Sequence, residues 1–489
     1  MHTNTKNYIM KAISPPVITR VVLLALSVMM VTACRKNLLE PTIKSSISSE
    51  VAFETPERVL GQVNDMYTKL KPAYFYGGRY IINSEIRGEE FLINKPNPSA
   101  GAEVFSQNLN SSSAHVIGFW AAAYTAINSA NVFMAGLTAN QSKIDPALYT
   151  QYIGEAKFVR ALAYLDLVQM YATPYAANNG ASPGIPLRLI AETGTGNNDL
   201  ARSTVAEVYA QILADLNDAE AGLPATYATA ALNTTRAHKN SAIALKIRTY
   251  LVMGNYPKVV EEASKIVSAT APFVASTGVN LKLETSFNTV FSGSYTGSEA
   301  ILFLPFTNAN APGAQVGLSY YYTPAPGNAE YYLNPNGILA NPALSAATDA
   351  RSSLIVVSGA NKWLNKFRLP AQYTDSSPVM RYAEVLLSYA EAAAETNDFA
   401  KATELLYAVR HRSDPSFEFA PEDIDGKESL ISTILTERRI ELLGEGLRPV
   451  DIQRRVQAFP AKAGAIGTSP RVEPTASNYI WPISGDELS

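Results

Sequence analysis

Two segments of the chain, 244–267 and 386–409, share one layout, and this layout restricts the possible folds more than any other feature of the sequence. They read ALKIRTYLVMGNYPKVVEEASKIV and LLSYAEAAAETNDFAKATELLYAV. Each contains an apolar stretch with helical spacing, a tight turn at GNY or NDF, and a second helical stretch that begins near a lysine. Small residues in such a pair let the two helices approach closely. Each segment therefore predicts a helical hairpin of the tetratricopeptide (TPR) type.

Helical spacing also covers much of the remaining chain. Thr55 followed by Pro56 is typical of a helix start, and Pro72 stops the helix that follows. Thr204 and Glu207 have the spacing of a capping box. Further helices are expected at about 115–136, 149–171, 204–222, 241–253, 257–268, 381–396, 399–412 and 428–446. The second and third of these are expected to form another helical pair.

Three segments lack helical spacing and are expected to be rich in loops. Residues from about 270 to 380 are dominated by Gly, Pro, Asn, Ser and Tyr and contain short strand-like runs such as AILFLPF and SLIVV. Residues 77–114 and 172–200 are interpreted in the same way. We therefore predict a mostly α-helical protein, with a TPR-like scaffold of helical hairpins and one large loop-rich insertion that contains short strands.

The N-terminus carries the only cysteine of the 489 residues, Cys34. Lys6, Lys11 and Arg20 precede an uncharged, largely apolar stretch at 21–33. This stretch is too short to span a bilayer, which takes about 20 residues. Its length and its basic flank are typical of the core of a signal peptide.

The sequence Val31-Thr32-Ala33-Cys34 resembles a bacterial lipobox. Cleavage before Cys34 would remove a lipoprotein signal peptide, residues 1–33, and make this cysteine the lipidated N-terminal residue. Residues 34–50 are polar and are expected to form a tether. Several acyl chains would hold the protein at a membrane, because each buried methylene contributes about 0.8 kcal/mol. A plain secretory signal with an incidental cysteine is the alternative.

The charge of the chain excludes some partners. Removal of residues 1–33 takes away three of the 40 basic residues and none of the 43 acidic ones, which leaves a formal charge of −6. No basic stripe is evident, so nucleic acid is not an expected partner. No other apolar run is long enough to cross a membrane. Without a second cysteine, an exported chain must be held together by packing rather than by disulfides.

Glu437, Glu441 and Glu445 recur every four residues and would share one face of a helix. Paired carboxylates could act as acid and base in glycoside hydrolysis. However, arginines at 438, 439, 448, 454 and 455 crowd the same segment. A carboxylate held by arginine stays ionised, which is unsuitable for a general acid. A structural network of ion pairs is therefore expected here, and no catalytic residue is predicted.

Other motifs of known chemistry are missing from the sequence or incomplete. The chain has no Gly-x-Ser-x-Gly motif and no phosphate-binding loop that ends in Gly-Lys-Ser/Thr, and its histidines lack metal-ligand spacing. The run DIDG at 423–426 resembles a fragment of a calcium loop without the remaining ligands. It is interpreted as a turn before the last helix, although calcium binding stays open. No cofactor and no metal site are predicted.

Five segments, in this order along the chain, resemble the SusD/RagB family. They are GEAKFVRALAYLDLVQMYATPY (154–175), RSTVAEVYAQILADLNDAEAGLP (202–224), RYAEVLLSYAEAAAE followed by AVRHRS (381–413), ERRIELLGEGLRPVDIQRR (437–455) and WPISGDEL (481–488). The resemblance extends over nearly the whole chain after residue 33 and includes the lipidated start. It implies a single SusD-like domain over residues 51–489.

The resemblance also implies a role. Proteins of this family are outer-membrane lipoproteins of Bacteroidetes-type bacteria, which lie over a SusC-like TonB-dependent transporter and help to capture oligosaccharides. The implied partners are therefore the transporter, an oligosaccharide ligand and the membrane, through the lipid on Cys34. The implied location is the outer membrane, with the protein exposed at the cell surface. The implied protein is not an enzyme.

Aromatic residues are the expected glycan ligands, because the C–H faces of sugars stack on flat rings. Trp120, Trp363 and Trp481 lie in segments that are expected to be buried. Tyrosines instead cluster in three segments expected to be loops, YFYGGRY (74–80), SYYYT (319–323) and EYYLN (330–334). If these loops converge, some rings should be exposed and form a shallow platform; packing of the rings against the helices is the alternative. The predicted ligand-binding residues are Tyr74, Tyr76, Arg79, Tyr320, Tyr321, Tyr322, Tyr331, Tyr332 and Asn334.

Two other functions fit the same architecture. The protein could capture peptides, or act only as an adaptor that binds a protein partner. A glycoside hydrolase is less favoured, because the acidic residues are crowded by arginines. Product formed from a panel of glycans would indicate the hydrolase, and peptidase genes beside a transporter gene would indicate the peptide ligand.

Overall fold

The helices form one continuous series of contacts. In the computed structural model, which describes residues 51–194, 196, 199–325 and 327–488, about 51% of the chain is helical and the strands are short. The predicted fold class is therefore confirmed. The predicted signal peptide, Cys34 and the tether at 34–50 lie outside the described residues. The proposed division of the chain at residue 51 stays a prediction.

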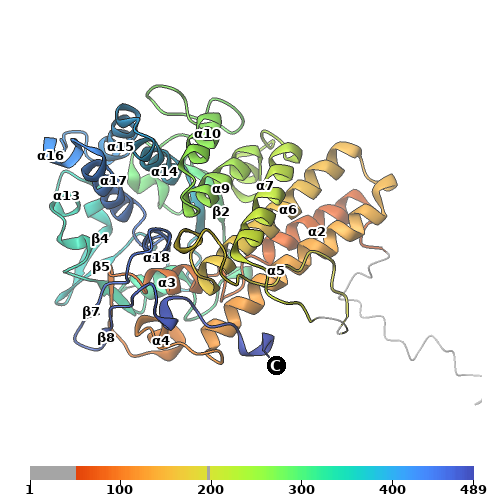
Figure 1. Ribbon diagram of the computed structural model, residues 1–489, viewed down its shortest axis with the longest axis horizontal. Helices are drawn as coiled ribbons and strands as arrows, with labels where there is room; N and C mark the ends of the chain where they lie inside the picture. Colours follow the sequence, from red (N-terminus) through yellow and green to blue (C-terminus); the bar gives the residue numbers. More distant parts are fainter. Residues whose placement is uncertain (1–50, 195, 197–198, 326, 489) are drawn as a thin grey trace, which may run out of the picture. The chain divides into compact units, whose positions relative to one another are not determined.

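Each predicted hairpin is a pair of packed helices. They are α6 (Pro146–Tyr171) with α7 (Val205–Gly222), α9 (Lys239–Val252) with α10 (Tyr256–Ile266), and α14 (Tyr382–Glu395) with α15 (Phe399–Ser413). Helix α5 (Ala114–Ala139) packs on α6, and α2 (Pro56–Thr68) packs on both. Figure 1 shows the series running from α2 and α5 to α15 and α17 (Lys427–Glu441). The contacts of α7 with α9 and of α10 with α14 join the pairs.

The two segments with the same layout fold for the same local reasons. The turn between the helices contains one residue in the left-handed conformation, Gly254 (φ 72°) in the first pair and Asn397 (φ 66°) in the second. The next residue caps the second helix. The side chain of Asn255 accepts a hydrogen bond from the amide of Lys258, and Asp398 accepts one from Lys401. The lysine noticed in each sequence is therefore the third residue of a capped helix.

Helix α17 is shorter than predicted. It ends at Glu441, and a second helix, α18 (Arg448–Arg454), follows after a turn. The backbone amides of Gly444 and Gly446 in this turn donate to the buried carboxylate of Glu85 at 3.2 and 2.8 Å. The expected helix over 428–446 was therefore wrong beyond Glu441, because a partner from the N-terminal part of the chain holds the turn.

The strands form four small antiparallel pairs. Their order is β1 with β3, β2 with β6, β4 with β5 and β7 with β8. The bounds are β1 Phe91–Ile93, β2 Ala300–Leu304, β3 Tyr331–Leu333, β4 Ile355–Ser358, β5 Asn361–Leu364, β6 Ser377–Arg381, β7 Lys462–Ala463 and β8 Thr468–Ser469. Strands β2 and β4 correspond to the strand-like runs AILFLPF and SLIVV. The predicted insertion contains five of these strands.

Short helices interrupt the segments that were expected to be rich in loops, which otherwise consist mainly of turns and irregular backbone. Helix α3 (Arg79–Glu85) and helix α12 (Leu318–Tyr322) include residues of the first two tyrosine clusters, and β3 includes residues of the third. Residues 74–78 of the first cluster lie in turns, as expected, whereas the expectation of loops was wrong for most of the second and third clusters, which lie in α12 and β3. The remaining short helices are α4 (Ala102–Phe105), α8 (Ala230–Thr235), α11 (Phe287–Val290), α13 (Pro342–Ser345) and α16 (Pro421–Ile424).

The acidic residues considered for catalysis belong to a buried network of ion pairs, as predicted. Arg381 contacts Glu299 and Glu441 at 2.6 Å and Glu445 at 2.8 Å. Burial alone would raise the pKa of Glu441, but the guanidinium groups of Arg412, Arg381 and Arg351 hold it below its ordinary value. The network consists of Arg351, Arg381, Arg410, Arg412 and Lys366 with Asp349, Glu299, Glu437, Glu441 and Glu445.

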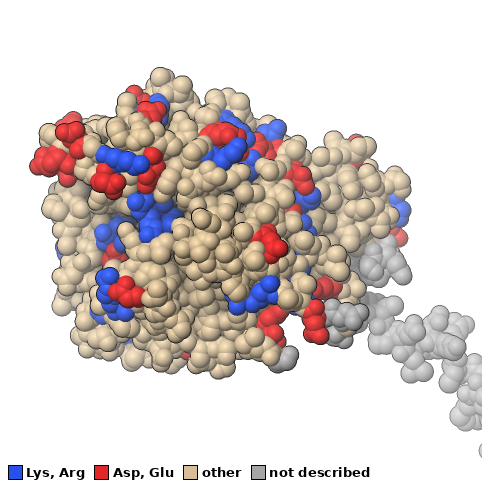
Figure 2. Space-filling model, viewed as in Figure 1, with Lys and Arg blue, Asp and Glu red and all other residues tan. Residues whose placement is uncertain are grey.

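All three tryptophans are buried, as expected: the exposed fractions of Trp120, Trp363 and Trp481 are 5%, 4% and 2%. Among the described residues, no helix combines the length and the apolar character that a membrane span needs. On the face drawn in Figure 2, basic side chains lie beside acidic ones in small groups, and most of the surface is uncharged.

Candidate ligand-binding surface

The three tyrosine-bearing segments come together in the tertiary structure. Gly78 approaches the 316–317 segment so closely that a Cβ atom on it would lie 2.0 Å from the carbonyl oxygen of Val316. Backbone hydrogen bonds of 2.9 Å join the amide of Asn328 to the carbonyl of Tyr320 and the amide of Glu330 to that of Tyr321. The segments 74–80, 319–323 and 330–334 are therefore neighbours, although about 240 residues separate the first from the others.

Five of the seven predicted tyrosines are buried, so an exposed platform made from all of them is ruled out, while Tyr74 and Tyr320 stay partly exposed. That the predicted residues bind a ligand stays a prediction. The exposed fractions are 2% for Tyr76, 0% for Tyr321 and Tyr322, 1% for Tyr331 and 9% for Tyr332. Three of these hydroxyl groups donate short hydrogen bonds inside the protein. Tyr76 donates to Asp166 at 2.8 Å, Tyr321 to the carbonyl of Gln315 at 2.7 Å, and Tyr331 to the carbonyl of Ala100 at 2.9 Å. Tyr321 and Tyr322 lie in α12, Tyr331 and Tyr332 in β3, and Tyr76 in the turn before α3.

Asn334 is also buried, with an exposed fraction of 5%. Its side-chain amide donates to the carbonyl of Glu89 at 2.8 Å, and its Oδ1 accepts from the amide of Asn336. The side chain therefore fixes the turn after β3. This differs from the predicted position beside an open platform.

Two predicted residues, Tyr74 and Arg79, stay half-exposed and contact each other. The guanidinium carbon of Arg79 lies 4.4 Å from the centre of the Tyr74 ring, which is a cation–π arrangement. The Tyr74 ring meets His115 edge to face at 5.7 Å and lies directly over Gly118 of α5, where a Cβ would be 2.5 Å from it. Helix α5 thus supports the ring from below.

A second half-exposed pair is Tyr320 with Tyr373. Their rings meet edge to face, with centroids 5.4 Å apart. Gly317 brings the two segments together, since a Cβ there would lie 2.4 Å from the Cβ of Tyr373. The side chain of Asn328 donates to the Tyr320 hydroxyl at 2.8 Å. We call Tyr74, Arg79, Tyr320 and Tyr373 the aromatic surface.

Amide side chains border the aromatic surface. Asn97 donates to Oε1 of Gln315 and to Oε1 of Glu330, both at 3.3 Å. Lys95 donates to Oδ1 of Asn328 at 3.0 Å. Glu330 itself is fully buried, and its Oε2 has no hydrogen-bond partner among the described residues. Donors and acceptors are therefore held in fixed positions beside the rings.

Arg79 is the charged member of the aromatic surface, and Lys95 and the buried Glu330 are charged groups at its border. Arg79 forms no ion pair within the described part of the chain, and its buried Nε has no partner there. Burial lowers the pKa of His115 to about 4, and the charge of Arg79 acts in the same direction, so His115 is neutral at pH 7. Burial raises the pKa of Tyr321 to about 12 against the opposing effect of Arg79. Neither His115 nor Tyr321 is prepared to act as a base at neutral pH.

Three backbone conformations at this surface are unusual for residues other than glycine. Gln315, Ala329 and Tyr373 have φ angles of 59°, 55° and 60°. Such conformations cost about 1–3 kcal/mol each and concentrate at functional sites, where the surrounding structure enforces them. Their grouping around Tyr320 supports a functional role for this part of the protein.

Sequence reasoning missed four residues of this region: Tyr373, Asn97, Gln315 and Asn328. Tyr373 is an isolated tyrosine in PAQYTD and lacks the clustering that marks the other tyrosines in the sequence. The three amide residues lie in segments rich in Pro, Asn and Gly, where such side chains are common and carry no distinguishing signal.

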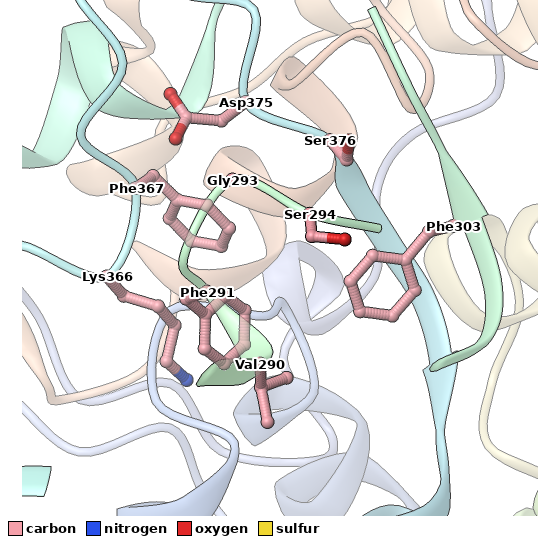
Figure 3. A pocket seen from close by; sticks show the side chains of 9 residues that line it. All are labelled: Val290, Phe291, Gly293, Ser294, Phe303, Lys366, Phe367, Asp375 and Ser376. Carbon is pink, nitrogen blue, oxygen red and sulfur yellow. The ribbon is translucent and has the colours of Figure 1, made fainter. Parts of the chain in front are cut away.

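Two further observations concern a small cavity and the possibility of a metal site. The cavity in Figure 3, between Phe291, Phe303 and Lys366, has a volume of about 20 Å³, which is room for about one water molecule. The described residues contain no group of three or more His, Cys, Asp or Glu side chains arranged to hold a metal ion. The aromatic surface offers what a flat, neutral and hydroxyl-rich ligand requires, namely rings for stacking and amides for hydrogen bonds.

Comparisons with known proteins agree with this picture. Residues 47–251 match the family model described as "Starch-binding associating with outer membrane", and residues 319–489 match that of the SusD family. A SusD superfamily protein from Bacteroides fragilis has a crystal structure with 32% sequence identity and a TM-score of 0.80, covering 89% of this chain and 98% of that one.

Two other relatives extend the comparison. SusD-like protein P2 from Formosa agariphila is 25% identical, over 92% of this chain and 94% of its own length. A laminarin-binding SusD-like protein of known structure has a TM-score of 0.71, with 89% of this chain and 98% of that one covered. Its identity of 22% shows a shared fold alone.

Proposed function

Since this chain belongs to the SusD/RagB family, we propose that it is a non-enzymatic protein that binds oligosaccharides on the aromatic surface and passes them to a SusC-like TonB-dependent transporter. The observation that carries the binding step is the half-exposed pair of Tyr320 and Tyr373, bordered by the amides of Asn328 and Gln315. Rings that keep an accessible face can stack on sugar C–H groups, and neighbouring amides can bond the hydroxyls.

The geometry favours an extended glycan over a single sugar. The aromatic surface joins two pairs of side chains, Tyr74 with Arg79 and Tyr320 with Tyr373. The pairs are connected through Tyr321, which packs against Tyr320 at 5.6 Å and whose pKa responds to Arg79. A ligand that contacts both pairs must present more than one ring. An open surface of this kind suits a chain better than a deep pocket does.

Binding without catalysis is supported by the state of the acidic residues. Glu437, Glu441 and Glu445 are buried among arginines, so they lack the access to substrate that glycoside hydrolysis needs. The neighbouring cations also hold the pKa of Glu441 and of Glu445 below the ordinary value, against the effect of burial, so neither supplies the proton of a general acid. On the aromatic surface, Glu330 is the neighbouring carboxylate, and it is fully buried beneath Asn97 and Asn328.

Location at the outer membrane is supported by the lipobox at Cys34 and by the family model that matches residues 47–251. The TPR-like helices are proposed to contact the transporter, because the four residues of the aromatic surface come from segments outside the helical hairpins. We expect a large outer-membrane β-barrel to co-purify with the full-length, tagged protein. Unchanged co-purification after substitution of exposed residues on both α10 and α15 would refute the assignment of this contact face.

Glycan binding is tested by native affinity electrophoresis and calorimetry with a panel of soluble polysaccharides and their oligosaccharides, and with peptide mixtures as the comparison. We expect at least one glycan to bind, and the double variant Tyr320→Ala/Tyr373→Ala to lose it. The control is Tyr149→Ala, a half-buried tyrosine on α6. Peptide binding without glycan binding would replace the proposed ligand, and full binding by the double variant would exclude the aromatic surface.

A further inference from the structure

A cavity that belongs to no part of the aromatic surface lies between α13, α16 and α17. Its volume is about 350 Å³, and its lining includes Phe417, Phe419, Ser432, Thr433 and Thr436. Small-molecule pockets in proteins measure about 300–1,000 Å³. This cavity is therefore large enough for a ligand and lies at the small end of that range, which suits one ring-sized unit. We call it the Phe417 pocket.

Two aromatic rings form a corner of the Phe417 pocket. Phe417 and Phe419 are both half-buried, and their rings meet at 75° with centroids 5.0 Å apart. The segment is held in place by α15: His411 Nε2 lies 2.8 Å from the Phe417 carbonyl oxygen, and Tyr407 packs edge to face on Phe419 at 5.1 Å. The rings are therefore presented in a fixed orientation, which reduces the entropy that a ligand would have to overcome.

The floor of the pocket is charged but internally neutralised. The guanidinium carbon of Arg410 lies 4.5 Å from the centre of the Phe417 ring. Arg410 Nη1 donates to Asp349 at 2.7 Å, and Nη2 donates to Glu437, which also accepts from Arg351 at 2.6 Å. Since these cations already have carboxylate partners, the floor offers no uncompensated charge to an anionic ligand.

The opposite wall carries hydroxyl groups on the outer side of α17. Thr433 donates to the carbonyl of Asp423 at 2.8 Å, and Thr436 donates to the carbonyl of Ser432 at 2.9 Å. Their oxygen lone pairs remain able to accept hydrogen bonds. Ser432 is exposed at the mouth. An apolar ligand would cover these hydroxyls without replacing their bonds to water, which is costly.

The geometry points to a second carbohydrate site: we propose that the Phe417 pocket binds a single neutral sugar unit, stacked on the corner of Phe417 and Phe419 and hydrogen-bonded to the hydroxyl wall. The aromatic faces suit the C–H side of a sugar ring, and the hydroxyl wall suits its hydroxyl groups. The paired floor attracts no anion, and the carboxylate of Asp423, which also lines the pocket, disfavours a negatively charged ligand. The site is built from other segments than the aromatic surface, so it would bind its ligand independently.

The test uses ligand-observed NMR on the purified protein with neutral monosaccharides as probes: glucose, galactose, mannose, fucose and N-acetylglucosamine. Glucuronate serves as the anionic comparison. We expect saturation transfer to at least one neutral sugar. Ser432→Trp, which places an indole in the mouth, should weaken that binding at least tenfold. Ser264→Trp, at an exposed serine on α10, is the matched control and should bind as the parent does.

A second variant tests sugar binding even if Ser432→Trp destabilises the protein. If Ser432→Trp lowers the melting temperature, Thr436→Val removes one hydroxyl at nearly constant volume and should weaken sugar binding severalfold. No transfer to any neutral sugar, stronger transfer to glucuronate, or equal transfer with both variants would overturn the proposal. Loss of transfer in Tyr320→Ala/Tyr373→Ala with full transfer in Ser432→Trp would place the monosaccharide on the aromatic surface, which overturns this second site and leaves the proposed function intact.

Discussion

The hydroxyl of Tyr76 donates a 2.8 Å hydrogen bond to Oδ2 of Asp166, a residue 90 positions further along the chain. Tyr80 donates to the other carboxylate oxygen at 2.9 Å. Because Tyr76 and Tyr80 flank Arg79, one buried carboxylate of α6 fastens the segment that carries half of the aromatic surface. Asp166 therefore acts as a positioning residue that need not touch the ligand.

Asp166 should make stability depend on pH. Burial raises its pKa from the ordinary value near 3.8 to about 7, against the lowering by the two tyrosine hydroxyls and Arg248. Between pH 4 and 7 the native state holds a proton that the unfolded state has lost, so this group's contribution to stability falls as pH rises, by at most about 1.4 kcal/mol per unit. Above pH 7 the contribution of Asp166 to the free energy of unfolding no longer changes with pH.

Urea unfolding at pH 4.5, 5.5, 6.5 and 7.5 tests this for the parent and for Asp166→Asn, which cannot ionise. We expect the parent's free energy of unfolding to fall relative to that of the variant through this range. A difference between the two proteins that does not change with pH would show that Asp166 titrates normally.

Tyrosines of the aromatic surface and tyrosines of the core should respond oppositely to substitution. Tyr320→Ala should weaken binding of a glycan by about 1 kcal/mol or more, roughly fivefold in Kd, and leave the melting temperature nearly unchanged. Tyr331→Ala should lower the melting temperature by several degrees, because it removes a ring that is 1% exposed and leaves a cavity. Calorimetric titration and melting curves distinguish the two; early melting of both variants would assign Tyr320 to the core.

The buried network should depend strongly on Arg381. Arg381→Met leaves the carboxylates of Glu299, Glu441 and Glu445 short of a partner, so the free energy of unfolding should fall by about 3–5 kcal/mol. Arg471→Met is the control, since Arg471 and Glu473 form an exposed pair worth about 0–1 kcal/mol. Urea unfolding measures both variants. If the free energy of unfolding fell by a similar amount in each, the buried ion pairs of Arg381 would contribute no more to stability than the exposed pair of Arg471.

Cys34 should anchor the protein. Replacement of the lipobox cysteine in Cys34→Ala should move the protein out of the membrane fraction, because no acyl chain can be attached. Metabolic labelling with palmitate is the measurement. Continued labelling of the variant would show that another residue carries the lipid.

The helical scaffold could be predicted because its causes are local. The capping box at Thr204, the capped turns after Gly254 and Asn397, and helical spacing all act within a few residues. Three hairpins and the burial of the tryptophans follow from such patterns. The arginines around Glu441 likewise indicated a structural network, since opposite charges in one segment favour pairing.

Exposure of the tyrosines was decided by the tertiary structure alone. YFYGGRY and SYYYT look like loops in the sequence, but β1 pairs with β3, Asp166 binds Tyr76 and Tyr80, and Glu85 holds the turn that ends α17. Whether a ring lies in the core depends on which distant segment covers it, and no local pattern records that contact. The sequence by itself therefore determined the helices and the family, whereas long-range packing selected Tyr74, Tyr320 and Tyr373 as the rings that remain accessible.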